Sequence, residues 1–287
     1  MRRILFFIVL IGFLAYIPYP ANAKSSENNT TPGKPNSTLQ AVRERGKLIV
    51  GVPNHEPPFG FVDKNGALKG MDIDIGEALG RKIFGKKDRI EFIHVTPVEK
   101  WKDFLQTKRI DILLVPLFIT EDRKKEIDFS IPCFVSGYLI LVNKDSKITN
   151  YQELGGKRVA TIQGTEGGRI LEELVPTSKQ VQFQYNDEAL QALKEQKVDA
   201  FWQLDVFVFY MAEKEKSLKV AYPQPIHPSA IGLGVRKGDN EWRDFVDIGL
   251  LEMMTSGEYR KLLDKWFGRV RGEFLELALR REIESKE

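Results

Sequence analysis

The chain has 287 residues, with 43 Lys and Arg against 40 Asp and Glu and a single Cys. This length fits one large domain or two small ones, and the near balance of charge gives no bulk electrostatic reason to bind nucleic acid. One Cys excludes an internal disulfide, so we expect Cys133 to be a buried structural thiol. No histidine pair has metal-ligand spacing, so we expect no metal site and no cofactor.

The first residues predict an export signal. Arg2 and Arg3 precede an apolar run over residues 4–17, and small residues before position 24 fit cleavage after Ala23. The run is shorter than the ~20 residues of a membrane span, although an uncleaved membrane anchor is the alternative. No Cys lies directly after the run, because the single Cys is Cys133, far downstream, which excludes a lipoprotein. We therefore expect a periplasmic protein with a cleaved signal peptide over residues 1–23.

Residues 24–47 are expected to form a flexible linker and a lead-in, because Ser, Asn, Thr, Pro and Gly dominate its first part. Beyond it, short β-type runs alternate with helical patterns, which indicates an α/β fold with mainly parallel sheets. The expected strands cover residues 48–52, 90–95, 112–115, 158–162, 181–185 and 200–204. The expected helices lie near residues 73–83, 101–105, 168–174 and 187–195, the last with Asp187 as its N-cap.

Two extended runs divide this alternating pattern. Residues 138–142 separate a first series of elements from a second, and residues 230–235 return the chain to the first series. The pattern predicts lobe 1 over residues 48–137 and 230–268 and lobe 2 over residues 138–229, with the two crossings as a hinge. Residues 269–287 are expected to form a charged helical tail. Four apolar side chains can pack this tail against the folded part: Phe274, Leu275, Leu277 and Leu279.

Short motifs occur in a characteristic order between residues 48 and 268. They include Pro57-Pro58-Phe59-Gly60-Phe61, Gly70-Met71-Asp72-Ile73-Asp74, Ile119-Thr120-Glu121-Asp122-Arg123 and Asp264-Lys265-Trp266-Phe267-Gly268. The ordered set resembles the amino-acid-type (family 3) periplasmic substrate-binding proteins of bacterial ABC transporters. This resemblance implies a type II periplasmic-binding-protein fold, in which two lobes close on a small molecule without doing chemistry. It also implies an ABC transporter permease as partner, and we expect a monomer.

The resemblance places the ligand-binding side chains at Glu56, Trp101, Leu117, Phe118, Arg123, Thr165, Glu166 and Leu204. In the family, an arginine at the Arg123 position holds the ligand's α-carboxylate through two parallel charge-assisted bonds, although an ordinary helix-face arginine is the alternative. Thr165 precedes a helix whose first N–H groups can bind an anion, or it is a plain N-cap. Trp101 forms a pocket wall or packs in the core.

Four of these positions depart from the family pattern. The family usually has an aromatic residue where this chain has Glu56, and Ser or Thr where it has Phe118 and Glu166. It has an Asp, which receives the ligand's α-ammonium, where this chain has Leu204; Asp205 points to the other face if the strand continues. An α-ammonium therefore stays unpaired unless Glu56 or Glu166 reaches it, and an unpaired buried charge is strongly unfavourable. We expect weak or absent binding of the common α-amino acids.

Two arrangements of such a pocket are physically reasonable. Glu166 pairs with Arg123 and neutralises the carboxylate site, or Glu56 and Glu166 receive a cationic group. In the second arrangement, Trp101 or Phe118 packs against the apolar part of the ligand.

Two other functions stay open. Periplasmic cyclohexadienyl dehydratases resemble the same family, and a buried carboxylic acid at Glu166 would be the general acid of such a prephenate or arogenate dehydratase. A sensory or interaction protein would keep the clamp without transport.

Overall fold

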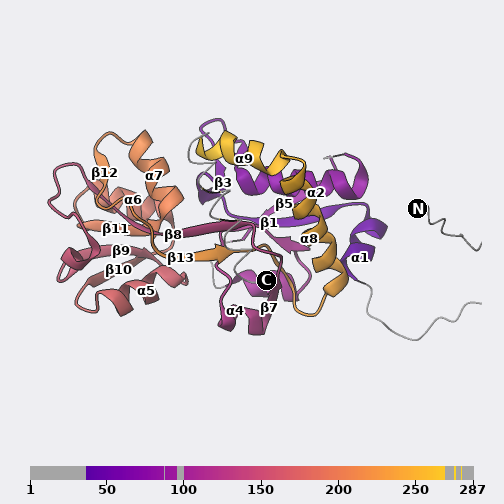
Figure 1. Ribbon diagram of the computed structural model, residues 1–287, viewed down its shortest axis with the longest axis horizontal. Coiled ribbons are helices and arrows are strands. Elements are labelled where there is room, and N and C mark those ends of the chain that lie inside the picture. The colour runs from indigo at the N-terminus through magenta and orange to yellow at the C-terminus, as the bar shows by residue number, and fades with distance from the viewer. Residues whose placement is uncertain (1–36, 87, 96–99, 269–274, 276–278, 280–287) are drawn as a thin grey trace, which may run out of the picture. The chain divides into compact units, whose positions relative to one another are not determined.

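The computed structural model describes residues 37–86, 88–95 and 100–268, together with Leu275 and Leu279. The expected signal peptide and most of the expected linker lie outside these residues. Residues 36–287 form a unit of their own, which contains two sheets with helices around each (Figure 1). No helix of the described part is both long and apolar enough to cross a membrane.

The first sheet, in lobe 1, has the strand order β5-β1-β6-β14-β7. Its strands are β1 (Leu48–Val52), β5 (Ile90–His94), β6 (Ile112–Leu113), β7 (Ile127–Phe129) and β14 (Gly234–Arg236). Strand β1 runs parallel to β5 and β6, whereas β14 runs antiparallel to β6 and β7. The lobe 1 helices are α1 (Thr38–Arg45), α2 (Met71–Phe84), α3 (Trp101–Gln106), α4 (Glu121–Glu126), α8 (Asn240–Thr255) and α9 (Glu258–Phe267). A small antiparallel sheet joins them, formed by β2 (His55–Glu56), β3 (Gly60–Val62) and β4 (Leu68–Lys69).

The second sheet, in lobe 2, has the order β10-β9-β11-β8-β12, with β13 also paired to β8. Its strands are β8 (Phe134–Asn143), β9 (Arg158–Ile162), β10 (Lys179–Phe183), β11 (Ala200–Leu204), β12 (Leu218–Val220) and β13 (Ile226–Ile231). Strand β9 runs parallel to β10 and β11, whereas β8 runs antiparallel to β11, β12 and β13. The helices are α5 (Glu166–Leu174), α6 (Asn186–Lys194) and α7 (Asp205–Lys214), with a 3₁₀ turn at Tyr151–Leu154.

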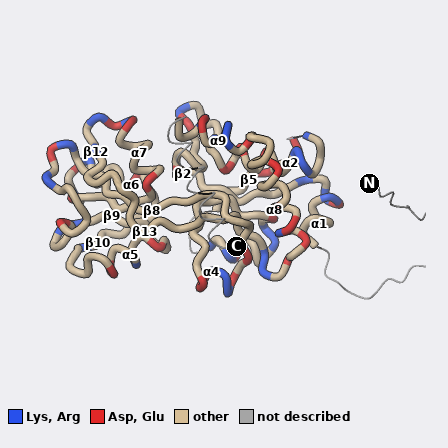
Figure 2. Tube along the Cα trace, viewed as in Figure 1, with Lys and Arg blue, Asp and Glu red and all other residues tan. Residues whose placement is uncertain are grey.

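Strands β8 and β13 connect the two lobes and lie side by side (Figure 1). Phe134 pairs with Ile231 at the lobe 1 end, and Tyr138 pairs with Ile226 further into lobe 2. The Ile231 carbonyl also accepts from the Cys133 N–H at 2.9 Å, so the pairing extends toward lobe 1. Neither strand contains Lys, Arg, Asp or Glu, and both are tan in Figure 2. Two crossings therefore join the lobes, as expected of a type II clamp.

The sheets differ from the expected ones in strand direction and length. Because the crossing strands and β14 run against their neighbours, both sheets are mixed rather than mainly parallel. The run expected over residues 230–235 is split, with β13 ending at Ile231 and β14 beginning at Gly234 in the other sheet. Helix α6 begins at Asn186 with Tyr185 at its N-cap position, so Asp187 is not the N-cap. The exact lobe boundaries at residues 137 and 230, which fall inside β8 and near the end of β13, stay a prediction.

The end of the stretch expected as linker and lead-in, residues 24–47, contains helix α1 (Thr38–Arg45). The Ser37 hydroxyl accepts from the Gln40 N–H at 3.3 Å and so caps helix α1. The Thr38 N–H donates to Asp239 at 3.0 Å, and Arg45 forms an ion pair with the buried Asp111. These contacts fix α1 against α8 and the central sheet.

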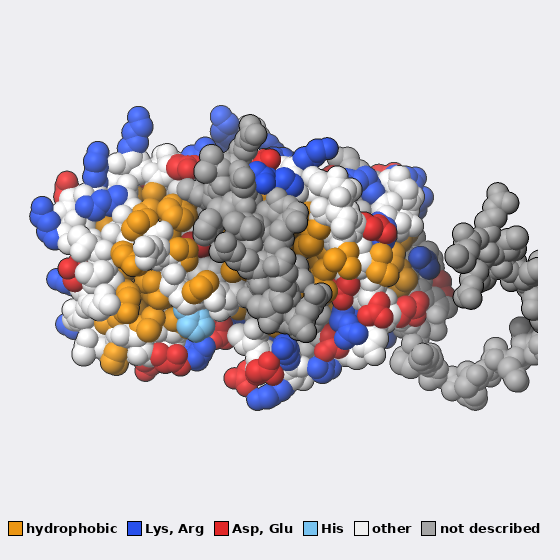
Figure 3. Space-filling model, in the orientation of Figure 1, with side chains coloured by type: hydrophobic (Ala, Val, Ile, Leu, Met, Phe, Trp, Pro, Cys, Tyr) orange, Lys and Arg blue, Asp and Glu red, His pale blue; other side chains and the backbone are white. Residues whose placement is uncertain are grey.

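Buried side chains from both lobes form the hydrophobic core, and two residues of the expected tail belong to it. Leu275 and Leu279 are helical and buried, which supports docking of the tail. Phe274 and Leu277 lie outside the described residues. On the face shown in Figure 3, Lys and Arg are interspersed with Asp and Glu, and hydrophobic side chains gather over lobe 2.

Candidate ligand-binding site

A pocket of about 60 Å³ lies between the lobes, where loops follow the parallel strands. Pro53 follows β1, Thr165 and Glu166 follow β9, and residues 184–186 follow β10. Ligands of open α/β sheets bind outside the carboxyl ends of the strands, and here such edges from both sheets line one pocket. This volume is small, so we expect that binding of a larger solute moves the lobes, or side chains of the wall, apart.

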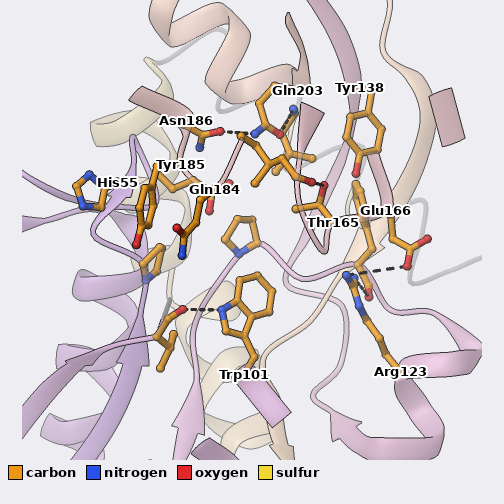
Figure 4. A pocket seen from close by; sticks show the side chains of 17 residues that line it. His55, Trp101, Arg123, Tyr138, Thr165, Glu166, Gln184, Tyr185, Asn186 and Gln203 are labelled. Carbon is orange, nitrogen blue, oxygen red and sulfur yellow. Dashed lines mark hydrogen bonds and ion pairs between the residues drawn. The ribbon is translucent and has the colours of Figure 1, made fainter. Parts of the chain in front are cut away.

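Arg123 and Glu166 approach each other across the pocket, one from each lobe (Figure 4). The Arg123 Nη2 lies 4.0 Å from the Glu166 Oε1, and its Nη1 donates to the Phe118 carbonyl at 3.0 Å. Glu166 Oε2 also accepts from the Arg169 Nε at 2.9 Å. Burial lowers the pKa of Arg123, and Glu166 opposes that shift. A ligand carboxylate would therefore meet an arginine whose charge is already partly neutralised.

Thr165 lies at the N-cap position of α5 but does not cap the helix with its side chain. Its hydroxyl donates instead to the Ile162 carbonyl at 2.7 Å, which closes the turn after β9. The start of α5 is packed tightly against lobe 2, because a Cβ on Gly167 would lie 2.8 Å from the Tyr138 ring. The Thr165 hydroxyl thus already donates to a backbone carbonyl, and the expected N-cap hydrogen bond from its side chain to α5 is not observed.

Aromatic side chains form the walls between the two ends of the pocket (Figure 4). The Trp101 indole N–H donates to the Val95 carbonyl at 2.6 Å, so this ring is fixed and serves as both wall and core. The rings of Phe118 and Tyr138 lie 5.7 Å apart, and Tyr138 stacks on Trp202 at 5.4 Å. Trp202 is buried behind Tyr138 and does not line the pocket.

Leu204 lines the pocket as an apolar side chain at the end of β11. The strand stops there, and Asp205 begins helix α7 instead of continuing the strand. Asp205 is buried and accepts from the Ser136 hydroxyl at 2.5 Å and from its neighbour's N–H, so it is bound within lobe 2. Beside Leu204, Gln203 donates to Asn186 at 2.5 Å, and both amides line the pocket.

At the end of the pocket away from Arg123, His55 of lobe 1 meets lobe 2 (Figure 4). Its Nδ1 lies 3.6 Å from the Asp187 carboxylate, and its ring centroid lies 5.2 Å from that of Tyr185. Both side chains are exposed, and even fully charged pairs at exposed sites are worth only ~0–1 kcal/mol. The lobes therefore touch on both sides of the pocket, weakly at this rim.

Glu56 lines the pocket from lobe 1, and the buried Asp72 lies near it. Burial raises the pKa of Glu56 to about 8, and Asp72 adds to that rise. Burial likewise raises the pKa of Asp72 to about 7. The Asp72 Oδ2 has no hydrogen-bond partner among the described residues.

The structure brings together nearly all of the side chains expected at the site. Seven of them line the pocket: Glu56, Trp101, Phe118, Arg123, Thr165, Glu166 and Leu204. Leu117 does not; it lines a neighbouring pocket on the other side of Trp101 and Arg123. Their roles in binding stay a prediction.

Sequence reasoning missed Tyr138 and the polar group formed by Gln184, Tyr185, Asn186 and Gln203. A strand was expected to run to residue 185, which hid the loop after β10. The signal that could have found this loop is its position after a parallel strand. Within the described residues, no three His, Cys, Asp or Glu side chains are grouped as metal ligands.

Comparison with known proteins gives consistent matches over nearly all of the folded part. Residues 48–269 match the model of the bacterial extracellular solute-binding proteins, family 3. The chain is 30% identical over 269 residues to the ABC transporter glutamine-binding protein GlnH of Bacillus subtilis, a match that covers 93% of this chain and 97% of that protein.

Solved structures resemble the two-lobed fold closely. A mutant of ArgBP from T. maritima has a TM-score of 0.75 at 31% identity, covering 80% of this chain and 99% of that one. The ancestral amino acid-binding protein AncCDT-1, a precursor of cyclohexadienyl dehydratase, has a TM-score of 0.75 at 34% identity, covering 80% and 100%.

Proposed function

Because the chain belongs to the bacterial extracellular solute-binding proteins of family 3, we propose that it captures a small polar solute between its lobes for an ABC importer. The observation that carries this proposal is the interlobe pocket, which Arg123 and Glu166 enter from opposite lobes. A solute bound there contacts both lobes and so stabilises the closed arrangement over the open one. The hinge of β8 and β13 lets the lobes separate for entry and release.

The solute is not a typical zwitterionic α-amino acid. Arg123 is shared with Glu166, which supports the arrangement in which the old carboxylate site is neutralised. Leu204 offers no acceptor to an α-ammonium, and Asp205 is held within lobe 2 by Ser136. The relatives named for glutamine and arginine binding therefore support capture of a small polar solute without identifying it.

Capture takes place outside the cytoplasm. The proposed signal peptide ends at Ala23, and the mature protein is a monomer that delivers its solute to a permease without a lipid anchor. N-terminal sequencing of the protein from the periplasmic fraction should begin at Lys24. Recovery of the form that begins at Met1 in the membrane fraction would favour an uncleaved anchor.

A binding function fits this pocket better than a dehydratase does. The candidate general acid, Glu166, already contacts the guanidinium groups of Arg123 and Arg169. These contacts hold its carboxylate away from the role of a proton donor to a bound substrate. We expect no consumption of prephenate or arogenate; turnover that disappears in Glu166→Gln would establish the enzyme instead.

A thermal-shift screen tests the capture proposal, because a ligand that binds only the folded state raises the melting temperature. The panel contains α-amino acids, amines and carboxylates without an amine. For each hit, small-angle scattering with and without the solute reports whether the lobes close. A Tm rise without a change in scattering would argue against a clamp.

Arg123→Ala tests the anion contact, with Arg158→Ala as the matched control. Arg158 forms an ion pair with Asp199 on the outer part of lobe 2, away from this pocket. For a solute with a carboxylate, losing Arg123 should weaken binding by ~2–5 kcal/mol in calorimetry, whereas the control should not change it. Equal affinities for both variants would remove Arg123 from the site.

A further inference from the structure

Glu56 is fixed at the pocket by the N-terminus of helix α2. The turn that begins at Glu56 is closed by the Phe59 N–H, which donates to the Glu56 carbonyl at 2.9 Å. The Met71 N–H donates to Pro58 at 3.0 Å, and the Asp72 N–H donates to Phe59 at 3.0 Å. The first turn of α2 thus holds the Glu56 turn in place and brings Asp72 near enough to act on Glu56 electrostatically.

The two carboxyl groups have no cationic partner among the described residues. Asp72 is 5% exposed and its Oδ2 makes no hydrogen bond there. The arginine of the pocket, Arg123, is held by Glu166 and by the Phe118 carbonyl. A buried acid without a cationic partner is energetically costly. No described side chain supplies that positive charge at the Glu56 end of the pocket.

The groups that face Glu56 do not supply that charge. Asp72 is acidic, and the neighbouring His55 is directed to Asp187 at the exposed rim. Tyr138 also lines the pocket; burial raises the pKa of its phenol, and the charges of Glu166 and Glu56 add to that rise. Among the titratable side chains around the pocket, the cationic ones are therefore already engaged with other carboxylates.

We propose that Glu56 receives a cationic nitrogen of the solute, a protonated amine or a guanidinium, and so determines which solutes the pocket accepts. This inference rests on the proposed solute-binding function and names the class of its substrate. The aromatic walls suit such a group, since Trp101 and Tyr138 can pack against the carbons next to the nitrogen and attract its charge.

The proton on Glu56 makes the proposal measurable. With a pKa of about 8, raised by burial and then by Asp72, the carboxyl is mostly protonated at pH 7. A bound cation requires the ionised form, so binding at pH 7 should release about one proton. Below pH 8 the affinity should fall about tenfold for each pH unit, and above pH 8 it should level off.

The experiment uses the purified protein and probes that differ in charge but hardly in shape. A length series of linear diamines is compared with the matching diols, and guanidinobutanoate is compared with ureidobutanoate. We expect members of the cationic sets to raise the Tm and the neutral partners not to. Calorimetry at pH 7 in phosphate and in Tris then counts the released protons from the difference in apparent enthalpy. Sodium and potassium chloride at equal ionic strength distinguish an organic cation from an inorganic one.

Two variants test Glu56 itself, with Glu172→Gln on the exposed face of α5 as the control. Glu56→Gln should weaken binding of the cationic probe at least tenfold and abolish proton release. Asp72→Asn should act on proton release instead: at pH 7.5, where Asp72 is mostly ionised, it removes a neighbouring negative charge, lowers the pKa of Glu56 and reduces the number of protons released on binding. A merely structural role of these acids would not produce that shift, and Asp72→Asn keeps the test open if Glu56→Gln fails to fold.

The proposal is overturned if no cationic probe binds, if neutral partners bind as tightly, or if Glu56→Gln keeps its affinity within twofold. A response to sodium or potassium alone also overturns it. A neutral or anionic solute that raises the Tm and closes the lobes would remove the role of Glu56 but keep the capture function. If no solute of any class binds, both proposals fail.

Discussion

Replacing Asp72 by Asn should make the stability of this protein less dependent on pH. Asp72 lies in the first turn of α2, is 5% exposed, and has a carboxyl oxygen without a hydrogen-bond partner among the described residues. Burial raises its pKa from 3.8 to about 7. The native state therefore prefers the protonated acid, whereas the unfolded chain ionises readily.

The sign and size follow from this difference in pKa. Below pH 4 the acid is protonated in both states and costs no stability. As pH rises from about 4 to about 7, the unfolded state loses its proton first, which lowers its free energy relative to the native state, so stability falls. Above pH 7 the cost levels off. With these pKa values the cost is about 2 kcal/mol at pH 5 and about 4 kcal/mol at pH 8.

Asn cannot ionise, so Asp72→Asn removes this cost. The stability of the variant relative to the natural protein should therefore rise by about 2–3 kcal/mol between pH 5 and pH 8. The relief of Glu56, whose pKa Asp72 helps to raise, acts in the same direction. Any constant effect of the amide on packing cancels in this comparison between two pH values.

Urea unfolding of both proteins at pH 5 and pH 8 measures the free energies, with Glu172→Gln as the exposed control. Calorimetry should show a relative Tm gain of about 5–10 °C at the higher pH. The assignment of a buried, uncompensated acid is refuted if the difference in unfolding free energy between the two proteins is the same at pH 5 and pH 8. It is also refuted if Glu172→Gln changes with pH as Asp72→Asn does.

Three further predictions concern the same lobe. Gly70→Ala should cost at least ~3 kcal/mol, because its φ is 144° and a Cβ would lie 1.8 Å from the Phe59 carbonyl oxygen. Gly66→Ala, at φ 79° with nothing within 4 Å, should cost only ~1–2 kcal/mol by urea unfolding. Tyr259→Phe should lower stability by ~1–3 kcal/mol, because its buried hydroxyl donates to the Cys133 carbonyl; a change below 0.5 kcal/mol (about the error of such data) would contradict this. The Cys133 thiol is buried, which raises its pKa, so it should resist alkylation in the native protein and react in urea. Mass spectrometry measures the labelling, and fast labelling of the native protein would contradict this prediction.

The sequence alone determined the class of fold and the position of most elements. Continuous apolar runs such as residues 48–52 and 200–204 form strands that are largely buried. The sequence predicts such strands because apolar residue types indicate burial directly. The order of the short motifs identified the family that the comparisons confirm. It also placed Arg123 and Glu166 at the pocket, because loop positions in this family are fixed by neighbouring strands.

Only the tertiary structure decided which charges meet. Glu166 pairs with Arg123 because α5 of one lobe faces α4 of the other, and no local pattern records that approach. Asp72 acts on the charge of Glu56 because backbone hydrogen bonds hold the turn at Glu56 against a helix that begins more than ten residues later. Periodicity reports whether a side chain is buried, but the electrostatic partner of a buried charge depends on how separate segments pack, and in this protein that packing defines the candidate site.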